Sequence, residues 1–244
     1  MQQRPKQGMK PYRAATVLTS GLLLSAGPSI GSEYKSSAEQ MAATIRSKDP
    51  LVAEVKTHIN AKAGLKTGCG ETKDEKFEAF YCGKDGGVIV ISSKALENIG
   101  RSFGEVAVVA VVAHEFGHAR QHKVGGFTRN TIWTGSVDEL QADCVAGVYL
   151  ANYSPVTITE EKLDKASEFM KEMGSYIFIE RDWHGSPEMR SASLRYGFRA
   201  KDLGKCLATK ENNWGKIGET IDREIEAAPD KVDKLLKWGQ DILK

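Results

Sequence analysis

The pattern of hydrophobic residues is strongest at residues 106–113, where every position is valine or alanine. A helix that is hydrophobic on all of its faces is buried inside a protein. Polar residues become frequent after residue 113, and the pair Gly125-Gly126 is a strong stop signal for a helix. We therefore predict one long helix from about residue 103 to Lys123, whose first half lies in the core.

The region before this helix shows weaker patterns. Residues 34–64 carry two weak helical repeats that Asp49-Pro50 interrupts, and the second repeat ends near Gly64. Residues 65–87 are rich in glycine and charged residues, which predicts a loop.

A run of β-branched residues at 88–92 predicts the clearest strand of the chain, and residues 93–99 predict a short helix closed by Gly100. After the long helix, amphipathic spacing dominates. It predicts helices at residues 136–150, at 159–181, from Pro187 to about 203, and one or two within 211–244.

Candidate chemistry lies at the end of the buried helix, in the motif His114-Glu115-Phe116-Gly117-His118. Histidines at i and i+4 lie on one face, one turn apart, so both rings can reach one metal ion. Glu115 is turned about 100° from His114 and can face a metal-bound water without being a ligand. The motif is short enough to occur by chance. Its position at the end of a buried helix, where unpaired polar groups would be costly, favours metal binding.

The next helix offers the third ligand. Glu139 and Asp143 share one face, and zinc hydrolases of the His₂Glu type take a carboxylate ligand from a second helix. Asp143 could instead accept the second ring N–H of a ligand histidine. Glu139 also fits a capping box with Ser136, and Asp138 is a competing ligand that points about 100° away. These alternatives remain open at the level of sequence.

Other polar side chains are candidates for supporting roles. His184 comes just before a helix whose start is marked by Ser186 at the N-cap, and it is our first candidate for a donor to the oxyanion. Arg190 and Tyr149 are the second candidates. His122 shares a face with His118 but lies about 6 Å further along the axis, so we expect it to be exposed or behind a ligand.

Four cysteines are present, Cys69, Cys82, Cys144 and Cys206. No pair has the C-x-x-C spacing of a zinc knuckle, and an even number of cysteines is typical of proteins that form disulfides. Three pairings are possible in principle. We predict Cys69–Cys82, which closes a short loop, and therefore Cys144–Cys206.

The N-terminal segment, residues 1–31, has a basic start, an apolar run at 14–27 and small residues after Pro28. This layout predicts a secretory signal peptide and a mature chain that begins near Ser32, in the periplasm or outside the cell. The alternative is an uncleaved anchor, but the run is shorter than the roughly 17–25 residues of a spanning helix.

The charge of the chain is nearly balanced. Residues 1–31 contain four basic and no acidic residues, so their removal changes the formal net charge from +2 to −2. The basicity therefore belongs to the targeting segment, and we expect no nucleic-acid partner. We also expect no membrane span in the mature chain, because no later segment is apolar for long enough.

These motifs together resemble the bacterial family of putative neutral zinc metallopeptidases. The resemblance rests on the following segments: Gly68-Cys69-Gly70, Phe80-Tyr81-Cys82, the motif at 114–118, the E-L-Q-A-D-C-x-A-G segment at 139–147, and His184 to Arg190. It covers about residues 65–207.

The resemblance implies an α+β, mainly helical fold of the zincin kind, with a small β-sheet beside two active-site helices. We assign this domain to residues 32–210, which leaves 211–244 as a C-terminal helical extension. The resemblance also implies Glu139 as the third metal ligand and Asp143 as the residue that orients a histidine.

The implied function is a zinc-dependent peptidase with one Zn²⁺ per chain and a peptide or protein substrate. His114, His118 and Glu139 would hold the metal, and Glu115 would move the proton of the attacking water. Two alternatives remain: a zinc-containing binding or chaperone-like protein without peptidase activity, and a zinc amidase that acts on a non-peptide amide.

Overall fold

The computed structural model describes residues 30–72, 79–84, 86–124, 134–174 and 184–207. The predicted targeting segment lies outside the described residues except for its last two positions, which begin the first helix. The predicted C-terminal extension, residues 211–244, lies outside them as well.

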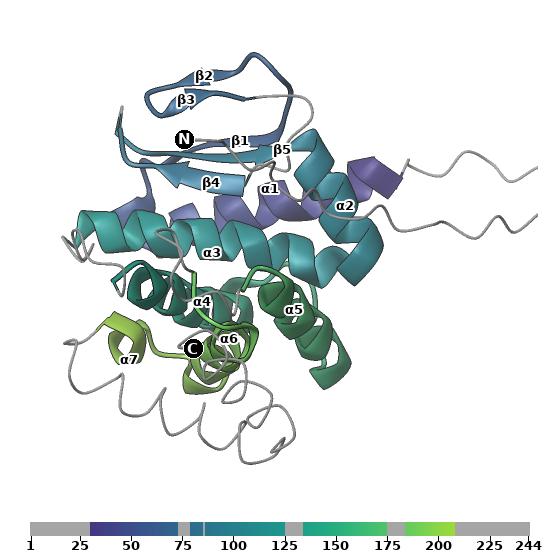
Figure 1. The fold of residues 1–244 in the computed structure, drawn as a ribbon, viewed down its shortest axis with the longest axis vertical. Helices are drawn as coiled ribbons and strands as arrows, with labels where there is room; N and C mark the ends of the chain where they lie inside the picture. The colour runs from purple at the N-terminus through teal and green to yellow at the C-terminus, as the bar shows by residue number, and fades with distance from the viewer. Residues whose placement is uncertain (1–29, 73–78, 85, 125–133, 175–183, 208–244) are drawn as a thin grey trace, which may run out of the picture.

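Helices make up most of the described chain, with a small mixed sheet beside them (Figure 1). The elements are α1 (Ile30–Lys48), the 3₁₀ turn η1 (Pro50–Val52), β1 (Lys56–Ala61), β2 (Lys66–Thr67), β3 (Gly70–Glu71), β4 (Ala79–Cys82), β5 (Val88–Ser92), α2 (Ser93–Phe103), α3 (Glu105–Lys123), α4 (Thr134–Tyr153), α5 (Glu160–Glu172), α6 (Pro187–Ala200) and α7 (Leu203–Leu207). The prediction of a mainly helical α+β domain is therefore confirmed.

The main sheet has the strand order β1-β5-β4, with β1 parallel and β4 antiparallel to the central strand β5. All five residues of β5 are buried, as expected for a strand covered on both faces. The prediction of a second helix before Gly64 is wrong, because β1 forms there. Its hydrophobic residues happened to have helical spacing, and the pairing with β5 is a long-range contact that a local pattern does not contain.

The predicted loop at residues 65–87 also contains strands. β2 and β3 form a small antiparallel hairpin, and β4 is an edge strand of the main sheet. Successive β4 residues point to opposite faces. Ala79 and Tyr81 pack against the large helical core, whereas Phe80 and Cys82 belong to the smaller cluster on the other face.

Helix α3 lies between the sheet and the helices α4 and α5 (Figure 1). Its residues from Val106 to Gly117 are all buried, which confirms that the valine and alanine run forms the core. This burial fixes α3 on both sides, so the side chains at its second half are held in place by the rest of the fold.

Close backbone contacts bring α4 against its neighbours. A Cβ added at Gly117 of α3 would come within 2.8 Å of the Ala142 carbonyl oxygen of α4. On the other side of α4, a Cβ at Gly147 would lie 2.0 Å from Leu194 O, and one at Gly197 would lie 1.8 Å from Cys144 O. Only glycine fits at these contacts, and they place the α4 carboxylates beside the α3 histidines.

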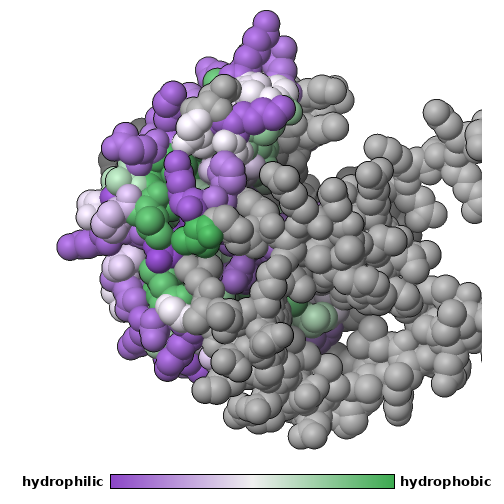
Figure 2. Space-filling view, turned by 90° about the vertical axis from the view of Figure 1, so that its left-hand side faces the viewer, coloured by the Kyte–Doolittle hydropathy of each residue, from purple (hydrophilic) through white to green (hydrophobic). Residues whose placement is uncertain are grey.

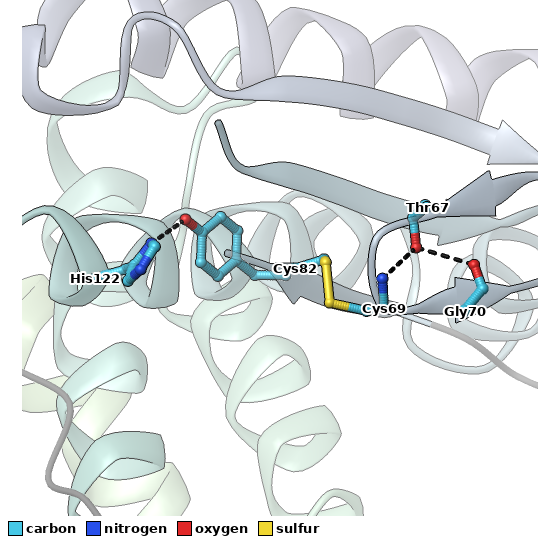
Figure 3. Close-up of a disulfide and its surroundings, with 6 residues drawn as sticks. Thr67, Cys69, Gly70, Cys82 and His122 are labelled. Atoms are coloured by element: carbon cyan, nitrogen blue, oxygen red, sulfur yellow. Dashed lines mark hydrogen bonds between the residues drawn. A yellow bond between two sulfur atoms is a disulfide. The ribbon is translucent and has the colours of Figure 1, made fainter. Parts of the chain in front are cut away.

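Two disulfides link Cys69 to Cys82 and Cys144 to Cys206, the two pairs predicted above. The first joins the β2–β3 hairpin to β4, and the hydroxyl of Thr67 beside it accepts from the Cys69 N–H and donates to the Gly70 carbonyl (Figure 3). The second joins α4 to α7.

On the face shown in Figure 2, hydrophilic residues cover most of the described surface and surround a smaller group of hydrophobic ones. Among the described helices, none combines the length and the hydropathy that crossing a membrane requires.

Three predicted boundaries shift. α2 continues past Gly100 to Phe103, α4 begins at Thr134 rather than after Ser136, and α6 ends at Ala200 with Lys201 in the left-handed conformation. α5 ends at Glu172, and the end of its predicted range, residues 175–181, lies outside the described residues.

Candidate metal centre

Three side chains from two helices meet at one point. One ligand atom from each of His114, His118 and Glu139 lies within 4.8 Å of the others, so this group could hold a metal ion. The carboxylate oxygens of Glu139 lie 3.3 Å from the Nε2 atom of His114 and 3.4 Å from that of His118. Helix α3 supplies both histidines and α4 supplies the glutamate, as the spacing of the motifs indicated.

The His114 ring is held by a buried carboxylate. Its Nδ1 atom lies 2.8 Å from Oδ1 of Asp143, which is completely buried. A proton on Nδ1 would lie against this carboxylate and leave Nε2 as the nitrogen that faces Glu139. Burial alone lowers the pKa of His114, but the side chains of Asp143 and Glu139 outweigh it and raise the pKa to about 10.

The His118 ring is held by a neutral amide. Its Nδ1 atom lies 2.8 Å from Oε1 of Gln121, which is completely buried. The Nε2 group of Gln121 donates to the carbonyl oxygen of Asp138 at 2.7 Å and to Oε1 of Gln141 at 3.0 Å. Because an amide oxygen only accepts, His118 carries its proton at Nδ1 and leaves Nε2 toward Glu139.

A buried arginine connects the two α4 carboxylates. Arg190 of α6 donates from Nε and Nη2 to Asp143, and its Nη1 lies 3.1 Å from Oε2 of Glu139. Burial raises the pKa of Glu139, but the His118 and His114 rings outweigh it and hold this pKa well below its usual range. Glu139 is therefore an ionised carboxylate whose direction is fixed by three partners.

Glu115 is the remaining acidic group of the site. Its side chain is buried, and its Oε2 atom has no hydrogen-bond partner among the described residues. Burial raises the pKa of Glu115 and outweighs the two histidines, which lower it. A carboxylate with a raised pKa and an unpartnered oxygen in a cleft is typical of a general base.

The other predicted residues take different places. His184 lines the cleft half-exposed, with its Nε2 3.9 Å from Glu139 Oε1. Tyr149 does not line the cleft, since its hydroxyl donates to Asp49 at 2.6 Å. The prediction of Tyr149 as a second candidate for the donor to the oxyanion is therefore wrong. The exposed His122 contacts the Tyr81 hydroxyl through Nδ1 at 2.8 Å (Figure 3).

Asp138 lies outside the three-residue group, and its contribution is the backbone carbonyl that accepts from Gln121. The capping alternative for Glu139 loses support, because α4 begins before Ser136 and the Glu139 carboxylate faces the histidines. Gln121 was not predicted. Its only signal in the sequence is its position three residues after His118, which puts both side chains on one face of a helix.

These groups open into a cleft of about 320 Å³. One part of the lining is polar and includes the metal-binding group, Glu115, His184 and Arg190. The other part is hydrophobic and comes from β4, from Val111 of α3 and from the C-terminal end of α5. An open cleft with convergent polar groups is the usual form of a small binding site.

The donor set fits zinc. Two imidazole nitrogens and one carboxylate are the ligand set of open catalytic zinc sites, which keep a fourth position for water. Each histidine has an acceptor on its second nitrogen, as metal-binding histidines usually do. Glu115 lines the same cleft, and one oxygen of its carboxylate has no hydrogen-bond partner among the described residues.

A family model described as "putative neutral zinc metallopeptidase" matches residues 56–208. Comparison of the chain with curated proteins and with solved structures gave no match. The matched region contains every residue of the candidate metal centre and both disulfides.

Proposed function

Since the match covers more than half of the chain, the protein belongs to the putative neutral zinc metallopeptidase family, and we propose that it is a hydrolase that cleaves peptide bonds. His114, His118 and Glu139 would hold one zinc ion in this proposal. Bound zinc would lower the pKa of a water toward about 7 and polarise the scissile carbonyl.

Glu115 moves the proton in this mechanism. It comes one residue after His114 and lines the cleft, and its carboxylate has an oxygen without a hydrogen-bond partner among the described residues, so it can take a proton from a water there. The same carboxyl can then return the proton to the leaving amine, which keeps the proton count balanced. Its raised pKa suits the first half of this transfer, because a carboxylate with an ordinary pKa is a weaker base.

The surrounding residues set the geometry. Asp143 and Gln121 hold the two imidazoles, and Arg190 holds Glu139. His184 is the donor that we propose for the developing oxyanion, because it lines the cleft and its ring is half-exposed. Arg190, the second candidate, is already engaged by two carboxylates and is better suited to positioning.

The single observation that carries the proposal is the convergence of the three ligand atoms within 4.8 Å, in the cleft that Glu115 also lines. The test is Glu115→Gln, assayed with a mixed peptide library and by zinc analysis. Zinc should stay bound at one ion per chain, while cleavage should fall by roughly 10²–10⁴-fold. Glu97→Gln, on the exposed Glu97–Arg101 pair of α2, is the matched control and should keep full cleavage.

Full peptide cleavage by Glu115→Gln would contradict the mechanism. A physiological activity that survives this change in full would instead favour the binding or chaperone-like alternative.

We further propose that the protein is exported. The pattern of residues 1–31 and the two disulfides support this, because disulfides persist in oxidising compartments. N-terminal sequencing of protein from its native host should give a start near Ser32. A start at Met1 on a membrane-bound form would show an uncleaved anchor instead.

A further inference from the structure

The hydrophobic part of the cleft includes five residues that we call the apolar wall: Ala79 of β4, Val111 of α3, Phe169 and Met170 of α5, and Met173 at the α5 C-cap. None of these side chains carries a charge or a strong hydrogen-bonding group. A charged ligand group placed against them would lose its water without gaining a partner from the wall.

The apolar wall begins directly beside the metal centre. Val111 precedes His114 by three residues and Glu115 by four, so these side chains are neighbours on one helix surface. Both α5 and β4 contact α3, which places their hydrophobic residues next to this surface. A group that lies on the apolar wall is therefore adjacent to a bond that reacts at the metal centre.

Most of the apolar wall is preformed. Phe169 and Met170 are almost fully buried, and the Phe169 ring packs against Phe103 at 5.7 Å between centroids. Val111 is held in the core of α3. A preformed surface binds a ligand without the cost of ordering it first.

Met173 differs from the rest of the wall, because it is 38% exposed. The exposed large hydrophobic residues of the described chain are Leu51, Val124 and Met173, and of these Met173 lines the cleft. It lies three and four residues after Met170 and Phe169, on the same face of α5. Methionine is flexible and adapts to hydrophobic groups of different shape.

We propose that the apolar wall binds a bulky hydrophobic side chain of a peptide, at the residue next to the scissile bond, and that Met173 determines this specificity. The proposal rests on the proposed peptidase function and adds the substrate class: peptides cleaved beside leucine, isoleucine, phenylalanine or methionine. Peptides with aspartate or lysine at that position are poor ligands.

The first test measures binding, by calorimetry of the zinc-loaded full chain with N-acylated hydroxamates of leucine, aspartate and lysine. The hydroxamate group is a metal ligand, so the three probes differ only in the side chain. The leucine compound should bind at least about 10-fold more tightly than the other two, since removing fitted hydrophobic groups from such pockets costs 10-fold or more.

Variants of Met173 test whether this residue determines the preference for a hydrophobic side chain. Met173→Lys should reduce the preference for leucine over aspartate by about 10-fold, because a cation on the wall favours the acidic side chain. Met173→Leu should keep the wild-type preference. The matched control is Glu172→Gln, which changes the charge by the same amount at the neighbouring exposed position and lies outside the lining of the cleft.

Cleavage-site mapping of a peptide library by mass spectrometry gives the second readout, and Met173→Lys should move the cleavage sites toward acidic residues. Equal affinity for all three hydroxamates, or an unchanged preference in Met173→Lys, would overturn the inference and leave the peptidase function standing. Failure of every hydroxamate to bind would contradict the metal site and the inference together.

Discussion

The two histidines of the metal centre have the same task but different supports. His114 lies against Asp143, an ionised carboxylate that is tied to Arg190 of α6. His118 lies against Gln121, a neutral amide that is tied to the backbone of α4 and to Gln141. Both supports are completely buried, so burial does not distinguish them.

The difference lies in what else each support holds. The charged support concentrates opposite charges in a low-dielectric interior, where loss of one partner leaves another charge unpaired. The neutral support is a relay of amides that continues from Gln121 through Gln141 to the carbonyl oxygen of Cys206. We therefore expect a change in the charged support to reduce stability and zinc affinity more than a change in the neutral support.

The largest effect is expected for Asp143→Asn. The change keeps the shape but removes the charge that Arg190 and His114 face, so Arg190 becomes an incompletely paired buried cation. We expect the free energy of unfolding to fall by about 3 kcal/mol and the zinc affinity to fall by about 10–100-fold. Urea unfolding and a chelator competition measure the two quantities.

Asp164→Asn is the control for this prediction. Asp164 pairs with Arg195 of α6, but its side chain is 61% exposed. Exposed ion pairs contribute little, so stability should change by less than about 1 kcal/mol. Similar losses in the two variants would show that buried charge is not what distinguishes the Asp143 support.

A smaller loss is expected for Gln121→Leu. The variant removes the acceptor of His118 and the two hydrogen bonds that Gln121 donates, to the Asp138 carbonyl and to Gln141. Unmade buried hydrogen bonds of this kind cost about 1–3 kcal/mol, and zinc affinity should fall by about 10-fold. Unchanged zinc affinity in the same competition assay would show that Gln121 does not orient His118.

Gln121→Glu sharpens the comparison, because it gives His118 a charged support like that of His114. The carboxylate still accepts from His118, so zinc affinity should stay close to that of the wild type. Stability should fall by about 1–3 kcal/mol, since the two acceptors beyond Gln121 now face a carboxylate. A loss of zinc as large as in Gln121→Leu would contradict this separation.

The smallest effect is expected for Gln141→Leu, at the far end of the relay. Gln141 is partly exposed, and water can replace some of its contacts. We expect a stability loss of about 1 kcal/mol, the typical value of one hydrogen bond, with zinc bound at full stoichiometry. A loss of zinc in this variant would mean that the relay, and not Gln121 alone, positions His118.

The same contrast explains what the sequence could predict. Asp143 stood out because a carboxylate in the middle of an apolar helix needs a partner, and the motif at 114–118 marked its own helix. Gln121 gave no comparable signal, because a glutamine near a helix end is usually solvated. Its role depends on the return of α4 across α3, which the glycine contact at Gly117 permits.

Strand pairing accounts for the other errors. β1 pairs in parallel with β5, which lies far along the chain, and β4 has only four residues, so neither shows in a local pattern. The hydrophobic face of α5 was predicted correctly as a helix face. That it lines the cleft beside His114 follows only from the packing of α5 against α3.

The central claim is that His114, His118 and Glu139 bind one zinc ion, and a crystal structure of the zinc-loaded protein with anomalous diffraction at the zinc edge tests it most directly. The account predicts one peak per chain, about 2.0–2.2 Å from Nε2 of both histidines and from a Glu139 oxygen. A peak bound instead by Asp138, Asp143 or His122, or no peak between α3 and α4, would contradict it.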